Sequence, residues 1–157
     1  HGEWAATGKV NQEVLAHLLA DPSFSRPPPK SLGKEYFSLD WLSGFLPTGM
    51  TEEDVQATVM ALTARSIANA VKQHEEPFAQ VAICGGGVHN THLMQMIANE
   101  LPDKEIVSTK QWGVDPDYME AMMFAWLAHQ TLSDTYLDLS HITGARKPVI
   151  LGAIYKA

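Results

Sequence analysis

Residues 81–91 read VAICGGGVHNT: a short apolar run, three consecutive glycines, and then Asn90 ahead of a helical pattern. An apolar run followed by glycines is typical of a buried strand that ends in a turn. Because glycine has no Cβ, it adopts positive φ and lets another group approach the main chain closely. The stretch predicts either a tight turn with Asn90 as the helix N-cap, or a turn against which a ligand lies. Both interpretations stay open on this stretch alone.

The order strand, turn, helix is repeated along the rest of the chain. Helices are predicted over 91–101 and 115–132, and strands over 105–109 and 149–155. The second of these helices is predicted to have Asp115 as its N-cap and Pro116 at its first position. Alternating strands and helices favour an α/β fold with parallel strands, right-handed crossovers and helices covering the sheet. Such folds bind ligands at the carboxyl ends of their strands, where Gly85, Gly86 and Gly87 lie.

A proline-rich stretch separates the helical patterns upstream. Residues 21–37 hold four of the nine prolines and show little periodicity, which predicts a long ordered loop or an extended crossing segment. Before it, a helix is predicted with Asn11 as its cap, and after it a short helix capped by Ser38. Thr51 then opens the longest predicted helix, which Pro77 closes.

Composition excludes several classes of protein. The 157 residues are 45% hydrophobic and 18% charged, which is typical of a globular domain. A net charge of -7 argues against a nucleic-acid partner, because phosphate binding needs clustered Lys and Arg. The one cysteine, Cys84, excludes an internal disulfide and favours a reducing compartment. No apolar run approaches the length of a membrane span, and the abrupt start at His1 suggests a piece of something longer.

Two specific glycine motifs are not matched. A dinucleotide fingerprint has glycine or alanine where Asn90 stands and an acidic residue at the end of the second strand, which here ends Ser108-Thr109. A P-loop requires Gly-Lys-Ser/Thr after its spacer, and none follows the glycines.

Other residues are considered as metal ligands or as core residues. His89 and His92 lie near Cys84, but no fourth ligand has a suitable spacing, so no metal site is predicted. Cys84 is interpreted as an inert apolar residue of a buried strand. Five methionines are predicted to fill the core: Met94, Met96, Met119, Met122 and Met123.

Glu120 falls in the first turn or so of the helix predicted over 115–132. One interpretation is a carboxylate that suits the positive end of the helix dipole. The other is a functional carboxylate, because this end of the helix lies in the same ligand-facing layer as the glycine turn.

Four segments together, residues 8–37, 83–97, 113–132 and 143–155, resemble the carboxyl-terminal half of the anhydro-N-acetylmuramic acid kinase family. The resemblance implies half of an actin-like (ribonuclease H-like) ATPase and sugar-kinase fold, in which two domains clamp ATP and a sugar. It implies that residues 1–50 link to the other half and that residues 51–157 form the core of the second domain. The family hydrolyses the anhydro ring of 1,6-anhydro-N-acetylmuramic acid and phosphorylates O6, giving N-acetylmuramate 6-phosphate during peptidoglycan recycling in the bacterial cytoplasm.

The resemblance also implies roles for residues. Gly85, Gly86 and Gly87, with Asn90 behind them, correspond to the nucleotide-contacting turn of the second domain. Glu120 corresponds to a carboxylate that holds the sugar or the attacking water. The loop from Pro27 to Gly33 matches a family signature with no assigned role, and Leu32 stands there in place of an expected threonine.

The family's phosphate-binding loop and its general-base aspartate do not occur in these 157 residues. We therefore expect the isolated chain to be inactive, and Mg²⁺ to be held by the ATP phosphates and the absent half. A homodimer is compatible with the resemblance. Alternatives from other classes are a non-catalytic nucleotide- or sugar-binding module, an oxidoreductase or methyltransferase of doubly wound type, and a structural domain that dimerises through its Met-rich helix.

Overall fold

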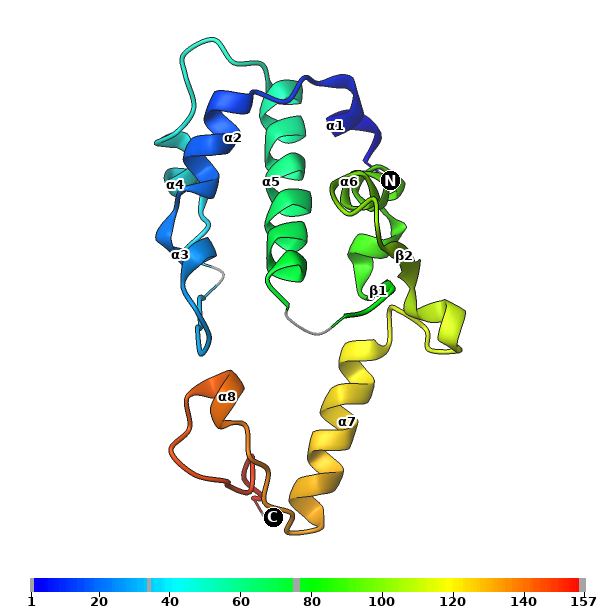
Figure 1. Ribbon diagram of the computed structural model, residues 1–157. Coiled ribbons are helices and arrows are strands. Elements are labelled where there is room, and N and C mark those ends of the chain that lie inside the picture. Colours follow the sequence, from blue (N-terminus) through cyan, green and yellow to red (C-terminus); the bar gives the residue numbers. More distant parts are fainter. Residues whose placement is uncertain (1, 34, 75–76, 156–157) are drawn as a thin grey trace.

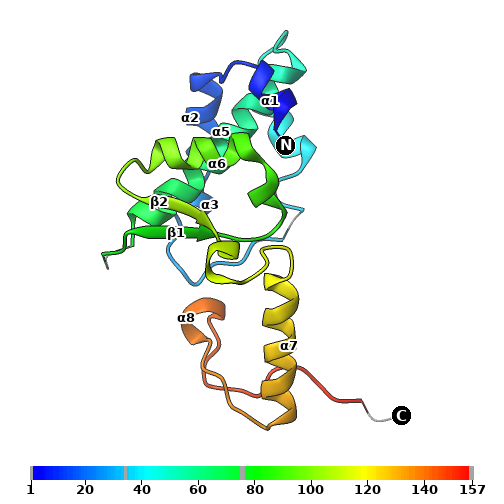
Figure 2. The same cartoon turned by 90° about the vertical axis from the view of Figure 1, so that its right-hand side faces the viewer.

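The computed structural model describes residues 2–33, 35–74 and 77–155. Figure 1 shows a body built around the long helix α5, with helices α7 and α8 projecting from it, and Figure 2 shows the same separation from the side. In chain order the elements are α1 (Glu3–Thr7), α2 (Gln12–Leu19), α3 (Pro22–Ser25), α4 (Leu39–Ser43), α5 (Glu52–Lys72), β1 (Gln80–Ile83), η1 (Gly86–His89), α6 (Thr91–Glu100), β2 (Glu105–Ser108), η2 (Thr109–Trp112), α7 (Met119–Leu132) and α8 (Ser140–Thr143).

The predicted parallel pairing is confirmed for the first two strands. β1 and β2 run parallel, with Gln80 opposite Glu105 and Ile83 opposite Ser108, and η1 and α6 connect them. The sheet has only these two strands within the described part of the chain, so each strand keeps an unpaired edge. The prediction of a buried first strand is therefore wrong: all four residues of β1 are partly exposed, and Cys84 after them is exposed.

The strand predicted over 149–155 does not form as such. Only an isolated antiparallel bridge joins Val149 to Leu137, through N–H to carbonyl hydrogen bonds of 3.0 and 3.1 Å. A strand is defined by main-chain hydrogen bonds to a neighbouring strand, and no described strand pairs with residues 150–155. The helix α7 lies beside them instead, and its Thr131 hydroxyl donates to the Leu151 carbonyl. The apolar pattern is present in the sequence, but within the described part of the chain no strand pairs along it.

Helix caps follow the sequence closely. The side chains of Asn11, Ser38, Thr51 and Asn90 each accept a backbone N–H at the start of a helix, as predicted. Two boundaries differ from the prediction. The long helix α5 ends at Lys72, before Pro77 is reached, and α7 begins at Met119 rather than at Asp115.

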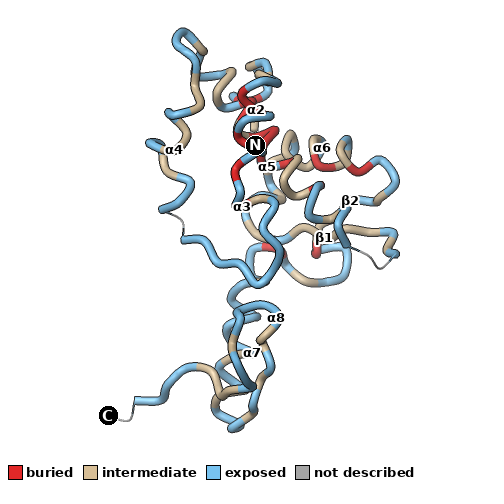
Figure 3. The backbone as a smooth tube through the Cα atoms, turned by 60° about the vertical axis from the view of Figure 1, so that its left-hand side comes forward, coloured by how far each residue is buried: buried red, intermediate tan, exposed pale blue. Residues whose placement is uncertain are grey.

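The core consists of two clusters of buried residues along α5. The first lies between α5 and α2, and the second lies between α5 and α6, where Val81 and Ile106 of the sheet pack against it. The cluster members are Val14, Leu15, Leu18, Ala61 and Leu62 in the first, and Ala64, Ala68, Ile97 and Leu101 in the second. Figure 3 shows that burial is concentrated in α2, α5 and α6, whereas α7 has no buried residue. The division predicted at residue 50 stays a prediction.

Asp21 anchors the proline-rich segment to this body. Its side chain is only 9% exposed and accepts hydrogen bonds from the Ser23 N–H at 2.8 Å, the Trp41 indole N–H at 3.0 Å and the Tyr36 hydroxyl at 3.0 Å. Burial opposes ionisation of the carboxyl, but these hydrogen bonds outweigh it, so the pKa of Asp21 lies below its ordinary value. Ring contacts of Phe37 with Trp41, at 4.9 Å between centroids, extend the anchor.

We predict that Asp21→Asn lowers the free energy of unfolding by about 2 kcal/mol at pH 7, because charge-assisted hydrogen bonds are lost from a buried site. A lowered pKa in the folded state means that the stabilisation is complete above the ordinary value of 3.8 and is lost as the pH falls through the lowered pKa. Urea denaturation at pH 7 and at pH values below 3.8 should therefore show the difference from wild type narrowing in acid.

Asp138→Asn serves as the matched control for that measurement. Asp138 also accepts a hydrogen bond from a backbone N–H, that of Ser140, and its pKa is likewise lowered by the hydrogen bonds from Ser140. Because Asp138 is exposed and has no aromatic donors, its substitution should change stability little. A constant difference between wild type and Asp21→Asn at all pH values would contradict the role given to the charge of Asp21.

Candidate functional site

The glycine turn lies directly at the carboxyl end of β1. Gly85 has φ of 78° and ψ of 177°, and its N–H donates to the carbonyl of Pro116 at 2.8 Å. The N–H groups of Val88 and Asn90 donate to the carbonyls of Gly85 and Gly87, each at 3.1 Å, which closes the short helix η1. The turn is thus held by the main chain on both sides. Of the three glycines, Gly85 alone has the positive φ that favours glycine.

The surface over the turn is open. A Cβ placed on Gly85 or Gly86 would meet no atom within 4 Å, and on Gly87 only the end of Leu93, at 3.9 Å. The fold therefore does not require glycine at 86 or 87 for steric reasons. Their N–H groups also have no acceptor among the described residues. Two free donors on an unobstructed main chain can bind an anion or the polar edge of a ligand.

Asn90 has the capping role that was predicted for it. Its Oδ1 accepts the Leu93 N–H at 3.0 Å and so begins α6 directly behind the turn. This bond uses the side-chain oxygen within the fold. A contact of Asn90 with a ligand stays a prediction.

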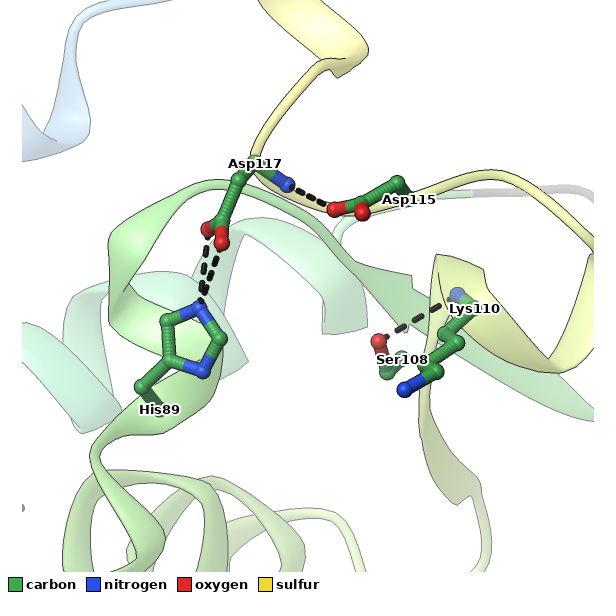
Figure 4. Close-up of polar contacts among 5 residues, drawn as sticks. All are labelled: His89, Ser108, Lys110, Asp115 and Asp117. Carbon is green, nitrogen blue, oxygen red and sulfur yellow. Dashed lines mark hydrogen bonds and ion pairs between the residues drawn. The ribbon is translucent and has the colours of Figure 1, made fainter.

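The segment before α7 docks on the glycine turn. Figure 4 shows the His89 ring pointing at the carboxylate of Asp117, with Nε2 at 2.8 Å from Oδ1 and 3.0 Å from Oδ2. Asp115 does not cap α7 as predicted: its Oδ1 accepts the Asp117 N–H at 3.0 Å and shapes a turn instead. The docked turn uses residues 115–118, so the helix starts only at Met119.

Glu120 lies in the first turn of α7 and is exposed. It follows Pro116, whose carbonyl accepts the Gly85 N–H, by four residues. The chain thus brings Glu120 and the glycine turn to the same end of the sheet, although they are 35 positions apart in the sequence (Gly85 to Glu120). Its role toward a sugar or water stays a prediction.

Polar side chains that the sequence reasoning did not assign to a ligand site also gather here. Lys110 follows β2, with its N–H donating to Ser108 Oγ at 3.3 Å, and Asp115 and Asp117 precede α7 (Figure 4). His89 was considered only as a zinc ligand. The sequence did hold a signal for the contact between His89 and Asp117. His89 lies just after the first predicted strand, and Asp115-Pro116-Asp117 follows the second. Because the carboxyl ends of parallel strands meet at one edge of the sheet, these two segments could have been expected to lie close together.

α7 carries an apolar surface that is open to solvent. The side chains of Met122, Met123, Phe124 and Trp126 are about half exposed, and Leu132 is 72% exposed. The prediction that Met122 and Met123 fill the core is therefore wrong for this chain, because no described element packs around them. Two apolar grooves lie away from the glycine turn, one of about 480 Å³ beside α7 and one of about 570 Å³ beside α4 and α5.

Two further findings concern absences. Among residues 2–33, 35–74 and 77–155, no three or more His, Cys, Asp or Glu side chains come together as a metal site would require. In the same ranges, no helix combines the length and hydropathy needed to cross a bilayer.

Comparison with known proteins bears on the whole chain. The sequence model of the family described as anhydro-N-acetylmuramic acid kinase matches residues 1–157. A protein of that name from Legionella pneumophila (strain Corby) is 49% identical over 154 residues, which cover 98% of this chain and 42% of the relative. Proteins of the same name from Xylella fastidiosa and Coxiella burnetii are 48% and 44% identical over 99% and 98% of this chain.

The chain spans about two fifths of the length of the curated relatives that it matches. The match is nevertheless continuous over the glycine turn, the docked turn and α7, in the order in which they occur. The mixed α/β architecture with a parallel sheet agrees with the sugar-kinase and actin-like fold of these enzymes. This chain belongs to the anhydro-N-acetylmuramic acid kinase family.

Proposed function

We propose that this chain forms one wall of the cleft of an anhydro-N-acetylmuramic acid kinase. The reaction is hydrolysis of the anhydro ring of 1,6-anhydro-N-acetylmuramic acid with phosphorylation of O6 by ATP. The observation that carries the proposal is the glycine turn: an open main chain with the free N–H groups of Gly86 and Gly87, at the carboxyl end of a parallel strand. Family membership supplies the chemistry for which this turn is used.

The residues at the turn are suited to a nucleotide. Gly86 and Gly87 would donate N–H groups to it, and the absence of side chains leaves room for it against the backbone. Bound ATP supplies the phosphoryl group. Because the described residues offer no acidic cluster for Mg²⁺, we propose that the ion is held by the phosphates and by protein outside this chain. Glu120 would orient a sugar hydroxyl or the attacking water.

The apolar surface of α7 supports the idea of a second wall. A helix that is apolar on all sides is normally buried. Here α7 has no buried residue, and its one carboxylate is Glu120. We propose that protein corresponding to the remaining length of the relatives covers this helix and supplies the general base. The whole protein would act in the cytoplasm, where ATP is available, and its assembly as a homodimer can be tested by light scattering.

The test is a chimeric kinase in which this chain replaces the matching 154 residues of the Legionella pneumophila relative. We expect the chimera to form ADP and a phosphorylated sugar from ATP and 1,6-anhydro-N-acetylmuramic acid, and this chain alone to form neither. Phosphoryl transfer depends on positioning from both sides of the cleft, so one wall should not suffice. The intact Legionella protein is the control for the assay.

A folded chimera that releases no ADP with the sugar would contradict the proposal. Calorimetry of this chain with ADP then tests whether the chain binds nucleotide without catalysis. Tight binding of ADP by an inactive protein would favour a non-catalytic nucleotide-binding module of the same fold.

A further inference from the structure

Two contacts join the glycine turn to the segment that precedes α7, one between main-chain atoms and one between side chains. A main-chain hydrogen bond joins Gly85 N–H to the Pro116 carbonyl at 2.8 Å, and Pro116 is buried. A side-chain pair joins His89 Nε2 to the Asp117 carboxylate at 2.8 and 3.0 Å. The two contacts hold the beginning and the end of the short stretch 85–89 against two consecutive residues. They therefore restrain both the position and the rotation of the docked turn.

The residues between this junction and Glu120 are held in place by hydrogen bonds. The Asp117 N–H donates to Asp115 Oδ1 at 3.0 Å and the Tyr118 N–H donates to the Asp115 carbonyl at 3.2 Å, which makes residues 115–118 a closed turn. The Met122 N–H then donates to the Tyr118 carbonyl at 2.9 Å, so α7 continues directly from that turn. A change in the position of Asp117 is thus carried into the first turn of the helix, where Glu120 lies.

The exposure of the pair argues that stability is not its main contribution. The side chains of His89 and Asp117 are 54% and 52% exposed. A polar side-chain contact that is this accessible to water is worth only about 0–1 kcal/mol. Figure 4 shows that the pair joins the glycine turn to the residues just before α7. Along the chain these two segments are connected only through α6, β2 and η2. A weak contact at such a place affects geometry more than the free energy of unfolding.

We propose that His89 and Asp117 are a positioning pair that sets the orientation of α7, and with it Glu120, relative to the glycine turn. The inference rests on the proposed kinase function for its catalytic consequence. The pair holds the nucleotide side and the sugar side of the cleft in one geometry, and neither residue is assigned a contact with the reacting atoms.

The kinetic test is a double-mutant cycle in the chimeric kinase. We expect His89→Ala and Asp117→Ala each to lower kcat by about tenfold, because small misplacements of reacting groups are costly, while each KM changes less than about threefold. The double variant should be no worse than either single variant, since the same contact is lost in all three. His89→Gln, which keeps an N–H donor, should recover most of kcat.

An ion pair elsewhere in the chain provides the control. Arg65 and Glu100 join α5 to α6 at 2.6 Å, with 38% and 25% exposure, away from the glycine turn. Glu100→Gln should leave kcat unchanged. Unchanged kcat in both single alanine variants, or effects that multiply in the double variant, would overturn the positioning role.

A measurement on this chain keeps the inference independent of kinase activity. Spin labels at the exposed positions Gln95 in α6 and Ala125 in α7, on a Cys84→Ser background, report the distance between the two helices. We expect Asp117→Ala to broaden the distance distribution and Glu100→Gln to leave it unchanged. An unaltered distribution in Asp117→Ala would refute the pair's role in orienting α7. An inactive chimera would contradict the proposed function instead, and the spin-label result would still decide this inference.

Discussion

Glu120→Gln in the chimeric kinase is expected to lower kcat by about 100-fold, because a sugar hydroxyl or water that is no longer held in place by the carboxylate can cost that much. Glutamine keeps the size of the side chain and removes its charge. Glu120 is exposed in α7, so the melting temperature should change little. The measurements are ADP release coupled to NADH oxidation and a thermal melt of the same sample.

Glu13→Gln is the matched control for this prediction. Glu13 is also exposed and also lies in the first turn of a helix, α2, where it favours the helix dipole as Glu120 does. The two substitutions therefore have the same effect on helix electrostatics and differ only in position. Turnover and KM close to wild type in Glu120→Gln would leave the helix dipole as its only role.

Gly86→Leu in the chimeric kinase should raise the KM for ATP by about tenfold or more, because the side chain would fill the space left for the nucleotide. The substitution meets no protein atom within 4 Å of the new Cβ, and Gly86 does not have positive φ. The fold should therefore tolerate it. The KM for the anhydro sugar and the melting temperature should stay close to wild type, as measured by steady-state kinetics and thermal melts.

Gly85→Ala gives the contrasting result. Gly85 has φ of 78° and ψ of 177°, a conformation that is nearly restricted to glycine, so alanine there is strained by about 1–3 kcal/mol even though its Cβ has open space. This variant should have a lower free energy of unfolding than wild type even in the absence of nucleotide. If Gly86→Leu leaves the KM for ATP unchanged, the nucleotide does not lie over the turn.

Much of the local structure could be predicted from short stretches of sequence. Asn11, Thr51 and Asn90 were identified as caps because an N-cap bond joins residues only two or three positions apart. The parallel strands on either side of α6 followed from the alternation of apolar runs with a helical pattern. The position of the glycines at the carboxyl end of a strand followed from the same pattern.

The missed features depend on contacts between segments that are distant in the sequence. The start of α7 was placed four residues too early because Asp115 resembles a cap, and the docking of residues 115–118 on the glycine turn is not encoded locally. The segment 149–155 has the composition of a strand, but among the described residues it pairs only through the isolated bridge of Val149 with Leu137. Met122 and Met123 have the composition of core residues but no described element covers them.

The sequence by itself determined the helices α2, α5 and α6 with their caps, the two parallel strands and the family to which the chain is related. The helices and caps depend on hydrogen bonds and periodicities between near neighbours, and the parallel pairing follows from the order of apolar runs and helical patterns along the chain. Only the tertiary structure decided that Pro116 meets Gly85, that His89 pairs with Asp117 across 28 positions, and that the glycine turn is open. Contacts of that kind arise when distant segments pack together, and no short-range pattern specifies which surfaces will meet.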